Sequence, residues 1–236
     1  TGVCEAECRE INEVFFHYIT HKTPFVVLKY AMTLDGKIAA HTGDSRWVTG
    51  EAARRHVHET RNRLSGIMVG VGTVLADDPL LTCRIDGGRN PVRIVCDSHA
   101  RTPLGSQLVQ TANEIPTYIA VTARSERTAA LEEKGVRILI CGETDGHVDL
   151  TDLMQQLGSA GINGILLEGG SSLAFSALKA GIVRRVQAYI APKLIGGADA
   201  KSPVGGEGLA KMADALALQN VRSTPLGEDF LIEGRL

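Results

Sequence analysis

The sequence predicts an α/β fold in which a mostly parallel sheet is flanked by helices and gains antiparallel strands at its C-terminal edge. Short apolar runs alternate with helical patterns between residues 25 and 180, which is typical of βα units that build a parallel sheet. From Val183 onward, three strand-like runs follow without helices of comparable length between them. Strands in such a tail are expected to join the sheet in antiparallel order.

The 236-residue chain has the composition of an ordinary globular protein, with 44% apolar residues and a formal charge of −2. No basic stretch predicts nucleic-acid binding, and no apolar run reaches the roughly 18 residues of a membrane span. No signal-peptide pattern is present. The five cysteines are scattered and odd in number, which favours reduced thiols in the cytoplasm. Cys4 and Cys8 lack a histidine or C-x-x-C partner, so no zinc site is predicted.

Residues 4–20 predict an amphipathic helix, because apolar side chains recur at helical spacing at Cys8, Ile11, Phe15, Phe16 and Ile19. After Pro24, the apolar run 25–32 predicts a central strand. Lys29 is an unusual residue inside such a run. It either lies at a sheet edge with its charge reaching solvent, or it presents a cation to a functional site.

A helix is predicted over residues 51–63, after a polar loop that ends in the only tryptophan, Trp47. Thr49 is its predicted N-cap, since a hydroxyl there can accept a free backbone N–H. The inner stripe of the helix contains His56, which we expect to be packed rather than catalytic. Arg61 lies in the last turn, where a cation suits the negative end of the helix dipole.

The remaining elements continue the alternation of strands and helices. A strand over residues 65–72 leads into a short helical turn that Asp78-Pro79 ends. The other elements are strands over 92–97, 117–121, 136–140 and 165–167, helices over 126–134, 150–157 and 172–180, and tail strands over 186–191, 215–221 and 230–232.

Residues 162–181 carry the most informative pattern, a buried strand that ends in Glu168 and continues as Gly169-Gly170. The glycines allow backbone N–H groups to approach a ligand closely. Together with Ser171, Ser172 and the positive end of the following helix, they predict a phosphate site. Thr73, after a second glycine-rich strand end, is expected beside the same pyrophosphate. The alternative is a tight strand-to-helix turn that binds no ligand.

Several blocks, in one order along nearly the whole chain, resemble the reductase domain of bifunctional riboflavin-biosynthesis proteins of the RibD family. They are Leu28-Lys29-Tyr30-Ala31, Leu34-Asp35-Gly36-Lys37-Ile38-Ala39, Gly43-Asp44-Ser45-Arg46-Trp47, residues 72–84, Leu167-Glu168-Gly169-Gly170 and Pro192-Lys193-Leu194-Ile195-Gly196-Gly197. So many blocks in one order are far more specific than any single motif.

The resemblance implies a dihydrofolate-reductase-like fold that uses NADPH to reduce 5-amino-6-(5-phosphoribosylamino)uracil to its ribitylamino product. Residues 24–236 are then the reductase domain, and residues 1–23 are a linker helix resembling the tail of the deaminase domain expected in the full-length chain. The H-x-E and P-C-x-x-C signature of that zinc deaminase is absent, so we expect neither zinc nor deaminase activity. Family members dimerise, which makes a homodimer the expected state.

By the same resemblance, the residues expected to hold NADPH are Ala31, Trp47, Thr73, Asp77, Ser98, Gly170, Ser171, Ser172, Leu173, Ala174, Phe175 and Ser176. The residues expected to hold the substrate are Ser45, Arg61, Leu81, Arg84 and Glu168, with the arginines on its phosphate. The adenosine 2′-phosphate is expected beside Ser98 and Arg101, with Thr122 and Arg124 as a second possibility.

The implied reaction transfers a hydride to C1′ of an opened ribose, and opening the ring needs a proton carrier. Glu168 and Lys29 are the candidates, and Asp35 and Asp77 are weaker ones. Because Glu168 and Lys29 lie in predicted central strands, we expect them to face one another across the substrate.

Two other functions remain open. A related enzyme of the same fold reduces the corresponding diaminopyrimidinone ribosylamine phosphate before deamination, and a non-catalytic nucleotide-binding module would need only half of this site.

Overall fold

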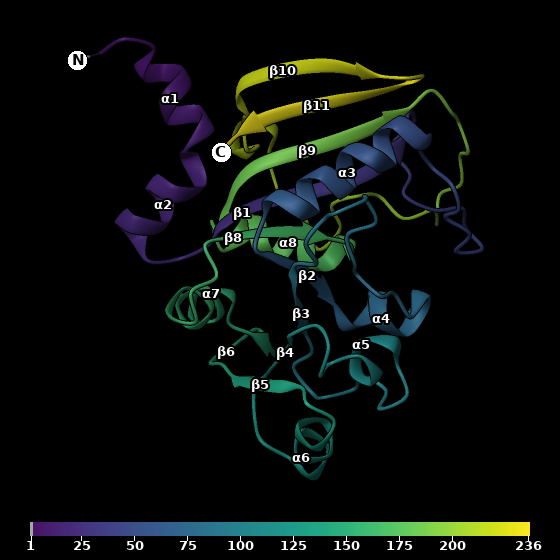
Figure 1. Ribbon diagram of the computed structural model, residues 1–236. Helices are drawn as coiled ribbons and strands as arrows, with labels where there is room; N and C mark the ends of the chain where they lie inside the picture. The colour runs from purple at the N-terminus through teal and green to yellow at the C-terminus, as the bar shows by residue number, and fades with distance from the viewer. Residues whose placement is uncertain (1) are drawn as a thin grey trace.

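The computed structural model describes residues 2–236 and has the predicted architecture, a mostly parallel sheet flanked by helices (Figure 1). The parallel strands are β1 (Phe25–Thr33), β2 (Gly66–Gly70), β3 (Val92–Cys96), β4 (Thr117–Val121), β5 (Arg137–Ile140), β8 (Gly164–Glu168) and β9 (Val183–Ala191). The helices are α1 (Glu5–Ile11), α2 (Glu13–His21), α3 (Glu51–Arg63), α4 (Val71–Asp77), α5 (Gln107–Gln110), α6 (Glu126–Glu133), α7 (Leu150–Ser159) and α8 (Ser171–Lys179).

The main sheet has nine strands in the order β10-β11-β9-β1-β8-β2-β3-β4-β5. The strands from β9 to β5 in this order pair in parallel. The C-terminal strands β10 (Gln219–Leu226) and β11 (Asp229–Arg235) extend it in antiparallel order at one edge. The predicted fold class is therefore confirmed.

The centre of the sheet is built from strands far apart in the sequence. β1 lies between β8 and β9, and Lys29 of β1 is level with Glu168 of β8 and with Gln187 of β9. β8 ends at Glu168, whereas β1 continues to Thr33 beside β9. This step in the sheet leaves the two charged residues at the carboxyl edge, where open α/β proteins bind ligands.

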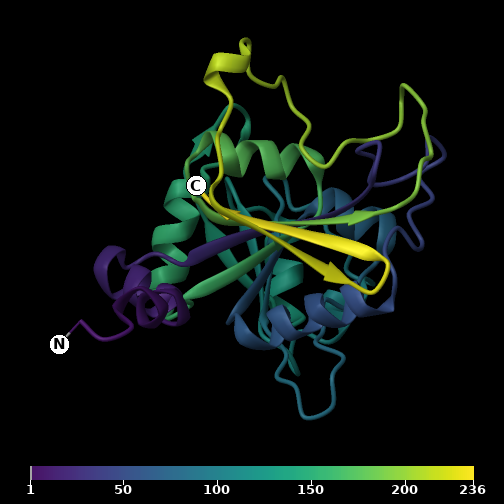
Figure 2. The same ribbon diagram turned by 90° about the horizontal axis from the view of Figure 1, so that it is seen from above.

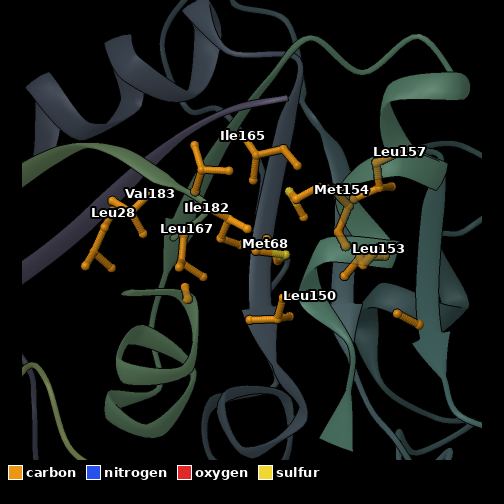
Figure 3. Close-up of a cluster of buried hydrophobic side chains, with 14 of the residues drawn as sticks. Leu28, Met68, Leu150, Leu153, Met154, Leu157, Ile165, Leu167, Ile182 and Val183 are labelled. Carbon is orange, nitrogen blue, oxygen red and sulfur yellow. The ribbon is translucent and has the colours of Figure 1, made fainter. Parts of the chain in front are cut away.

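Apolar side chains alternate between the two faces of the sheet and form separate cores on each. Leu28, Met68 and Ile165 pack with α7 and α8 in the core drawn in Figure 3. The opposite face is covered by α3 next to Val27 and Leu166, and by α4, α5 and α6 further along. Figure 2 shows α3 and α8 on opposite sides of the strands. Lys29 and Glu168 share the alternation of Val27 and Leu166, so both belong to the α3 face.

The N-terminal region is two helices and not the single helix predicted over residues 4–20. The first helix ends at Asn12, whose side-chain amide donates to the Cys8 carbonyl at 2.9 Å. Neither helix buries a residue, and Phe15 remains 54% exposed. Ion pairs hold the helices to the sheet edge, as Glu10 binds Arg222 at 2.8 Å. Local amphipathicity indicated the helical state but not this break.

Other local predictions were wrong in detail. Gly50, and not Thr49, is the N-cap of α3, and no side chain caps that helix. The strand predicted over 215–221 is β10, shifted to Gln219–Leu226, in which Pro225 is tolerated because β10 lies at the sheet edge. Helix α5 and the small hairpin of β6 (Glu143–Thr144) and β7 (His147–Val148) were not predicted. Within residues 2–236, no helix combines the length and apolar character needed to cross a membrane.

Candidate functional site

Two helix N-termini meet at the carboxyl edge of neighbouring strands. β2 leads through Gly70 into α4, and β8 leads through Gly169 and Gly170 into α8. Both latter glycines have positive φ, +94° and +78°, where a side chain would be strained. A Cβ atom on Gly169 would also lie 3.0 Å from the Thr73 hydroxyl oxygen. The close approach therefore requires glycine and brings Thr73 next to the start of α8.

The first turn of α8 keeps backbone donors available, because no side chain caps its N-terminus. Ser172 is exposed beside it, and Ser171 is half-buried. The Ser171 carbonyl accepts the Gly205 amide at 3.0 Å, so the loop that follows β9 packs against this turn. The helix dipole and these N–H groups have the polarity that favours an anion, and the phosphate site stays a prediction.

A buried ion cluster lies next to these helix ends. Glu168 accepts two bonds from Arg61, with Nε at 2.7 Å from Oε1 and Nη2 at 2.9 Å from Oε2. Lys29 Nζ lies 3.6 Å from Glu168 Oε2. We expected Lys29 and Glu168 to face one another across the substrate. That expectation is wrong, because their strands are adjacent and the side chains pair directly.

The ion cluster determines the ionisation of Glu168. Burial alone would raise its pKa, but the charges of Arg61 and Lys29 and the Arg61 hydrogen bonds lower it to about 2. Glu168 is therefore a carboxylate at neutral pH and has no proton to donate. The Glu168 charge in turn raises the pKa of Arg61, against the effect of its burial.

Lys29 contacts an aromatic residue, Tyr189, that sequence analysis did not single out. Its Nζ lies 5.8 Å from the centre of the Tyr189 ring, and the Tyr189 hydroxyl is 2.7 Å from His56 Nδ1. Tyr189 is fully buried, and burial followed by the Glu168 charge raises its pKa above its usual range. His56 is thus packed under the site, as predicted for the inner stripe of α3. Tyr189 could have been found only from the pairing of β9 with β1.

The segment 81–84 lies across α3. Arg61 Nη1 donates to the Thr82 carbonyl at 2.8 Å, and the Arg84 amide donates to His58 Nδ1 at 3.2 Å. Leu81 is buried and has a left-handed φ of +52°, a conformation that costs about 1 kcal/mol or more in a residue with a Cβ. His58 was missed by sequence reasoning, although it precedes Arg61 by one helical turn.

Of the other expected cofactor residues, Leu173, Ala174, Phe175 and Ser176 lie on α8, where Ala174 is buried in the core. Thr73 and Asp77 lie on α4, and Asp77 is exposed. Ser98 follows β3, and its hydroxyl accepts the Val148 amide at 3.0 Å. Arg101 is exposed, whereas Arg124 pairs with Glu132 at 2.9 Å.

Ala31 and Trp47 approach the site from β1 and the loop that follows it. Ala31 is half-buried on the α3 face of β1. Trp47 is 60% exposed, and the Arg54 guanidinium lies 4.7 Å from the centre of its ring. Ser45 is exposed in the same loop.

Asp35, a weaker candidate for proton transfer, serves as an anchor for a loop. It accepts the Thr33 hydroxyl at 2.5 Å and the Gly196 amide at 2.7 Å. These bonds, the one from Thr33 first, lower its pKa. Asp35 therefore fixes the loop after β9 against the end of β1.

An open, mostly parallel sheet with an ion cluster and two glycine-flanked helix N-termini at its carboxyl edge defines a ligand-binding α/β domain. The chain belongs to the RibD C-terminal domain family, whose model matches residues 24–232. The family resemblance inferred from the sequence is thereby confirmed.

Curated relatives support this membership. The chain is 52% identical over 233 residues to riboflavin biosynthesis protein RibD of Actinobacillus pleuropneumoniae, covering 98% of this chain and 62% of the relative. It is 47% identical over 215 residues to the 2,5-diamino-6-ribosylamino-4(3H)-pyrimidinone 5′-phosphate reductase of Methanothermobacter thermautotrophicus, covering 89% and 97%. The chain thus spans less than two thirds of the RibD protein it matches.

Solved structures agree. Acinetobacter baumannii RibD superposes with a TM-score of 0.86 at 26% identity, covering all of this chain and 64% of the other. The diaminohydroxyphosphoribosylaminopyrimidine deaminase/5-amino-6-(5-phosphoribosylamino)uracil reductase of Thermotoga maritima gives 0.80 at 32% identity, covering 99% and 62%.

Proposed function

We propose that this domain uses NADPH to reduce 5-amino-6-(5-phosphoribosylamino)uracil to 5-amino-6-(5-phosphoribitylamino)uracil in riboflavin biosynthesis. The observation that carries the proposal is the Lys29–Glu168–Arg61 cluster beside the N-termini of α4 and α8. Charged groups for a small phosphorylated substrate and an anion site for a dinucleotide lie at one sheet edge. The reductases named among the relatives have the same domain.

The residues present fit a dinucleotide. The uncapped first turn of α8 offers backbone donors for its phosphates, and the contact of Gly169 with Thr73 leaves no space for a side chain in that cradle. Gly170, Ser171 and Ser172 would hold the pyrophosphate, with Thr73 on its other side. When bound, the nicotinamide supplies the hydride. The protein's contribution is alignment, which can be worth about 7–11 kcal/mol.

Lys29 is the proton carrier in this proposal, and Glu168 is its partner. At a pKa of about 2, Glu168 cannot act as an acid at neutral pH. Lys29 is fixed between the Glu168 carboxylate and the Tyr189 ring. An ammonium held in that way can donate to the ring oxygen of the ribosylamine as it opens. Glu168 thus holds Lys29 in place for this proton transfer.

The two substrate arginines have different duties. Nε, Nη1 and Nη2 of Arg61 already donate to Glu168 and to the Thr82 carbonyl. Arg61 therefore fixes the carboxylate and the segment 81–84. The Arg84 side chain is exposed at the end of that segment, and its guanidinium is the stronger candidate for a bidentate grip on the substrate phosphate.

The runner-up function is reduction of the diaminopyrimidinone before deamination, favoured by the 47% identity to the archaeal reductase of that substrate. NADPH oxidation should be measured with both purified ribosylamine phosphates. We expect a higher kcat/KM with the deaminated uracil compound. A higher kcat/KM with the diamino compound would support the runner-up, and cofactor binding without turnover of either would support a non-catalytic module.

We also propose that the domain forms a homodimer, and that a deaminase domain precedes residues 1–23 in the full-length chain. β10 is an exposed edge strand, and Val221 on it is 55% exposed; such edges are paired or covered in native proteins. A monomeric mass by light scattering at micromolar concentration would contradict the dimer.

The free cysteines support a reducing compartment such as the cytoplasm.

A further inference from the structure

One face of α3 binds the segment that leads to Arg84. Arg61 and Asn62 follow His58 by three and four residues, so each is a neighbour of His58 on the helix surface. Arg61 holds the Thr82 carbonyl at 2.8 Å, His58 accepts the Arg84 amide at 3.2 Å, and Asn62 accepts the Arg89 amide at 2.8 Å. The backbone of this segment is thus held to His58 at Arg84.

The hydrogen bond to Arg84 fixes the chemical state of the His58 ring. A backbone amide can only donate, so Nδ1 must accept and the ring proton lies on Nε2. Partial burial, followed by the positive charges of Arg61 and Arg84, lowers the pKa of His58 to about 4. The imidazole therefore stays neutral near pH 7, and its acceptor remains available.

The start of the segment is fixed independently of His58. Arg93, which is fully buried, donates to the Leu80 carbonyl at 3.4 Å. Leu81 is held in its left-handed conformation with its side chain in the core. Beyond these residues the chain reaches Arg84, whose side chain is exposed. The position of the Arg84 guanidinium therefore depends on how firmly the Arg84 backbone is fixed.

We propose that His58 is a positioning residue of the phosphate site, which accepts the Arg84 backbone N–H and so directs the Arg84 guanidinium to the substrate phosphate. The inference rests on the proposed function, which assigns Arg84 to that phosphate. His58 touches neither the hydride donor nor the reacting carbon in this account. Its effect should appear in binding of the phosphorylated pentose and should depend on the Arg84 side chain.

The test uses His58→Leu, which removes the acceptor, and His58→Asn, whose amide oxygen can replace Nδ1. Arg55→Leu on the exposed face of the same helix is the control, since its side chain is 77% exposed. Kinetics with the ribosylamine phosphate give KM and kcat. Calorimetry with ribose 5-phosphate and with ribose measures binding without turnover. All variants are repeated in an Arg84→Ala background.

We expect His58→Leu to raise KM and weaken ribose 5-phosphate binding by about 3- to 10-fold, as for loss of one hydrogen bond. kcat should stay within about twofold and ribose binding unchanged, with His58→Asn and Arg55→Leu near wild type. In the Arg84→Ala background, His58→Leu should have no further effect, because the two changes remove one interaction.

An equal effect of His58→Leu with and without the Arg84 side chain would overturn the inference. So would a loss of kcat or of ribose binding in proportion to the loss of ribose 5-phosphate binding. If His58→Leu does not fold, His58→Gln, which moves the acceptor by one bond, must show the same Arg84-dependent loss. If the wild type reduces neither substrate, the proposed function fails. The calorimetry still tests the inference in that case. Ribose 5-phosphate binding that requires both His58 and Arg84 supports it. Binding that requires neither residue, or no binding at all, overturns it.

Discussion

Glu168 and Arg61 form a buried bidentate ion pair, with both carboxylate oxygens within 2.9 Å of the guanidinium. The pair joins the end of β8 to the last turn of α3, and Lys29 lies beside it. Breaking one partner of a buried pair leaves the other charge uncompensated, which costs about 3–5 kcal/mol in comparable sites. The Glu168 carboxylate therefore contributes to the stability of the domain as well as to its site.

The first prediction concerns acid stability. The folded pKa of Glu168, about 2, lies below its usual value of 4.5. Its contribution is therefore complete above about pH 4.5 and is lost as the pH falls toward 2. Glu168→Gln should lower the free energy of unfolding by about 3 kcal/mol at pH 7 and flatten its decrease between pH 4.5 and 2. Urea unfolding at several pH values measures this, and equal slopes in both proteins would contradict it.

The second prediction concerns cofactor choice. Arg101 is exposed after β3, whereas the Arg124 guanidinium is already paired with Glu132. Arg101→Ala should lower the NADPH/NADH ratio of kcat/KM by about 10-fold or more, the effect of losing a charged hydrogen bond. Arg124→Ala is the matched control and should change the ratio little. The reverse ranking in steady-state kinetics would assign the 2′-phosphate to Arg124.

The third prediction concerns the loop after β9. Gly206 has a φ of +73°, and a Cβ there would overlap the Phe175 ring on α8. Gly208 has a φ of +72° but faces open space. Gly206→Ala should therefore destabilise the loop by about 1–3 kcal/mol more than Gly208→Ala and weaken NADPH binding. Fluorescence titration with NADPH tests this, and equal affinities in the two variants would show that the packing on Phe175 is unimportant for the cofactor.

The fourth prediction concerns Arg93, which is fully buried and donates to the carbonyls of Leu108, Thr111 and Ile115. Burial lowers its pKa to about 10, so it is still charged at pH 7. Arg93→Met would remove these hydrogen bonds from a charged donor, each worth about 1.5–3 kcal/mol, although the Thr111 and Ile115 carbonyls keep other donors. We expect a loss of at least about 3 kcal/mol in unfolding free energy, with NADPH affinity retained in the folded fraction. A thermal midpoint near that of the wild type would contradict this role.

The sequence was sufficient for the central strands, because their apolar runs end in glycine or in a charged residue. It identified Lys29 and Glu168 as residues of one site, since both interrupt buried strands at the same edge. It could not show that they touch, because β8 enters the sheet next to β1 only after the chain has completed four other strands of the main sheet and the two strands of the hairpin. The place of β8 beside β1 follows from the strand order of the whole sheet and not from the local sequence of either strand.

His58 and Tyr189 were missed by sequence analysis for the same physical reason. His58 and Tyr189 act through partners distant in the sequence, namely the Arg84 amide, Lys29 and His56. Helical periodicity placed His56 on the inner stripe of α3 but said nothing of what it would meet. The break at Asn12 was missed for a similar reason, because the N-terminal helices are held by distant partners. These contacts are ion pairs to β10 and β11, the hydrogen bond from Tyr18 to the Gly158 carbonyl and the packing of Val14 on the core.

We propose that Lys29, held by Glu168, carries the proton for a hydride transfer from NADPH at this sheet edge. Single-turnover oxidation of bound NADPH with 5-amino-6-(5-phosphoribosylamino)uracil tests it directly, in the wild type and in Lys29→Met. We expect one NADPH oxidised per substrate by the wild type. Lys29→Met should bind both ligands but react about 10²–10⁴-fold more slowly, the usual effect of losing a general acid. A Lys29→Met rate near that of the wild type, or no NADPH oxidation by the wild type, would contradict the account.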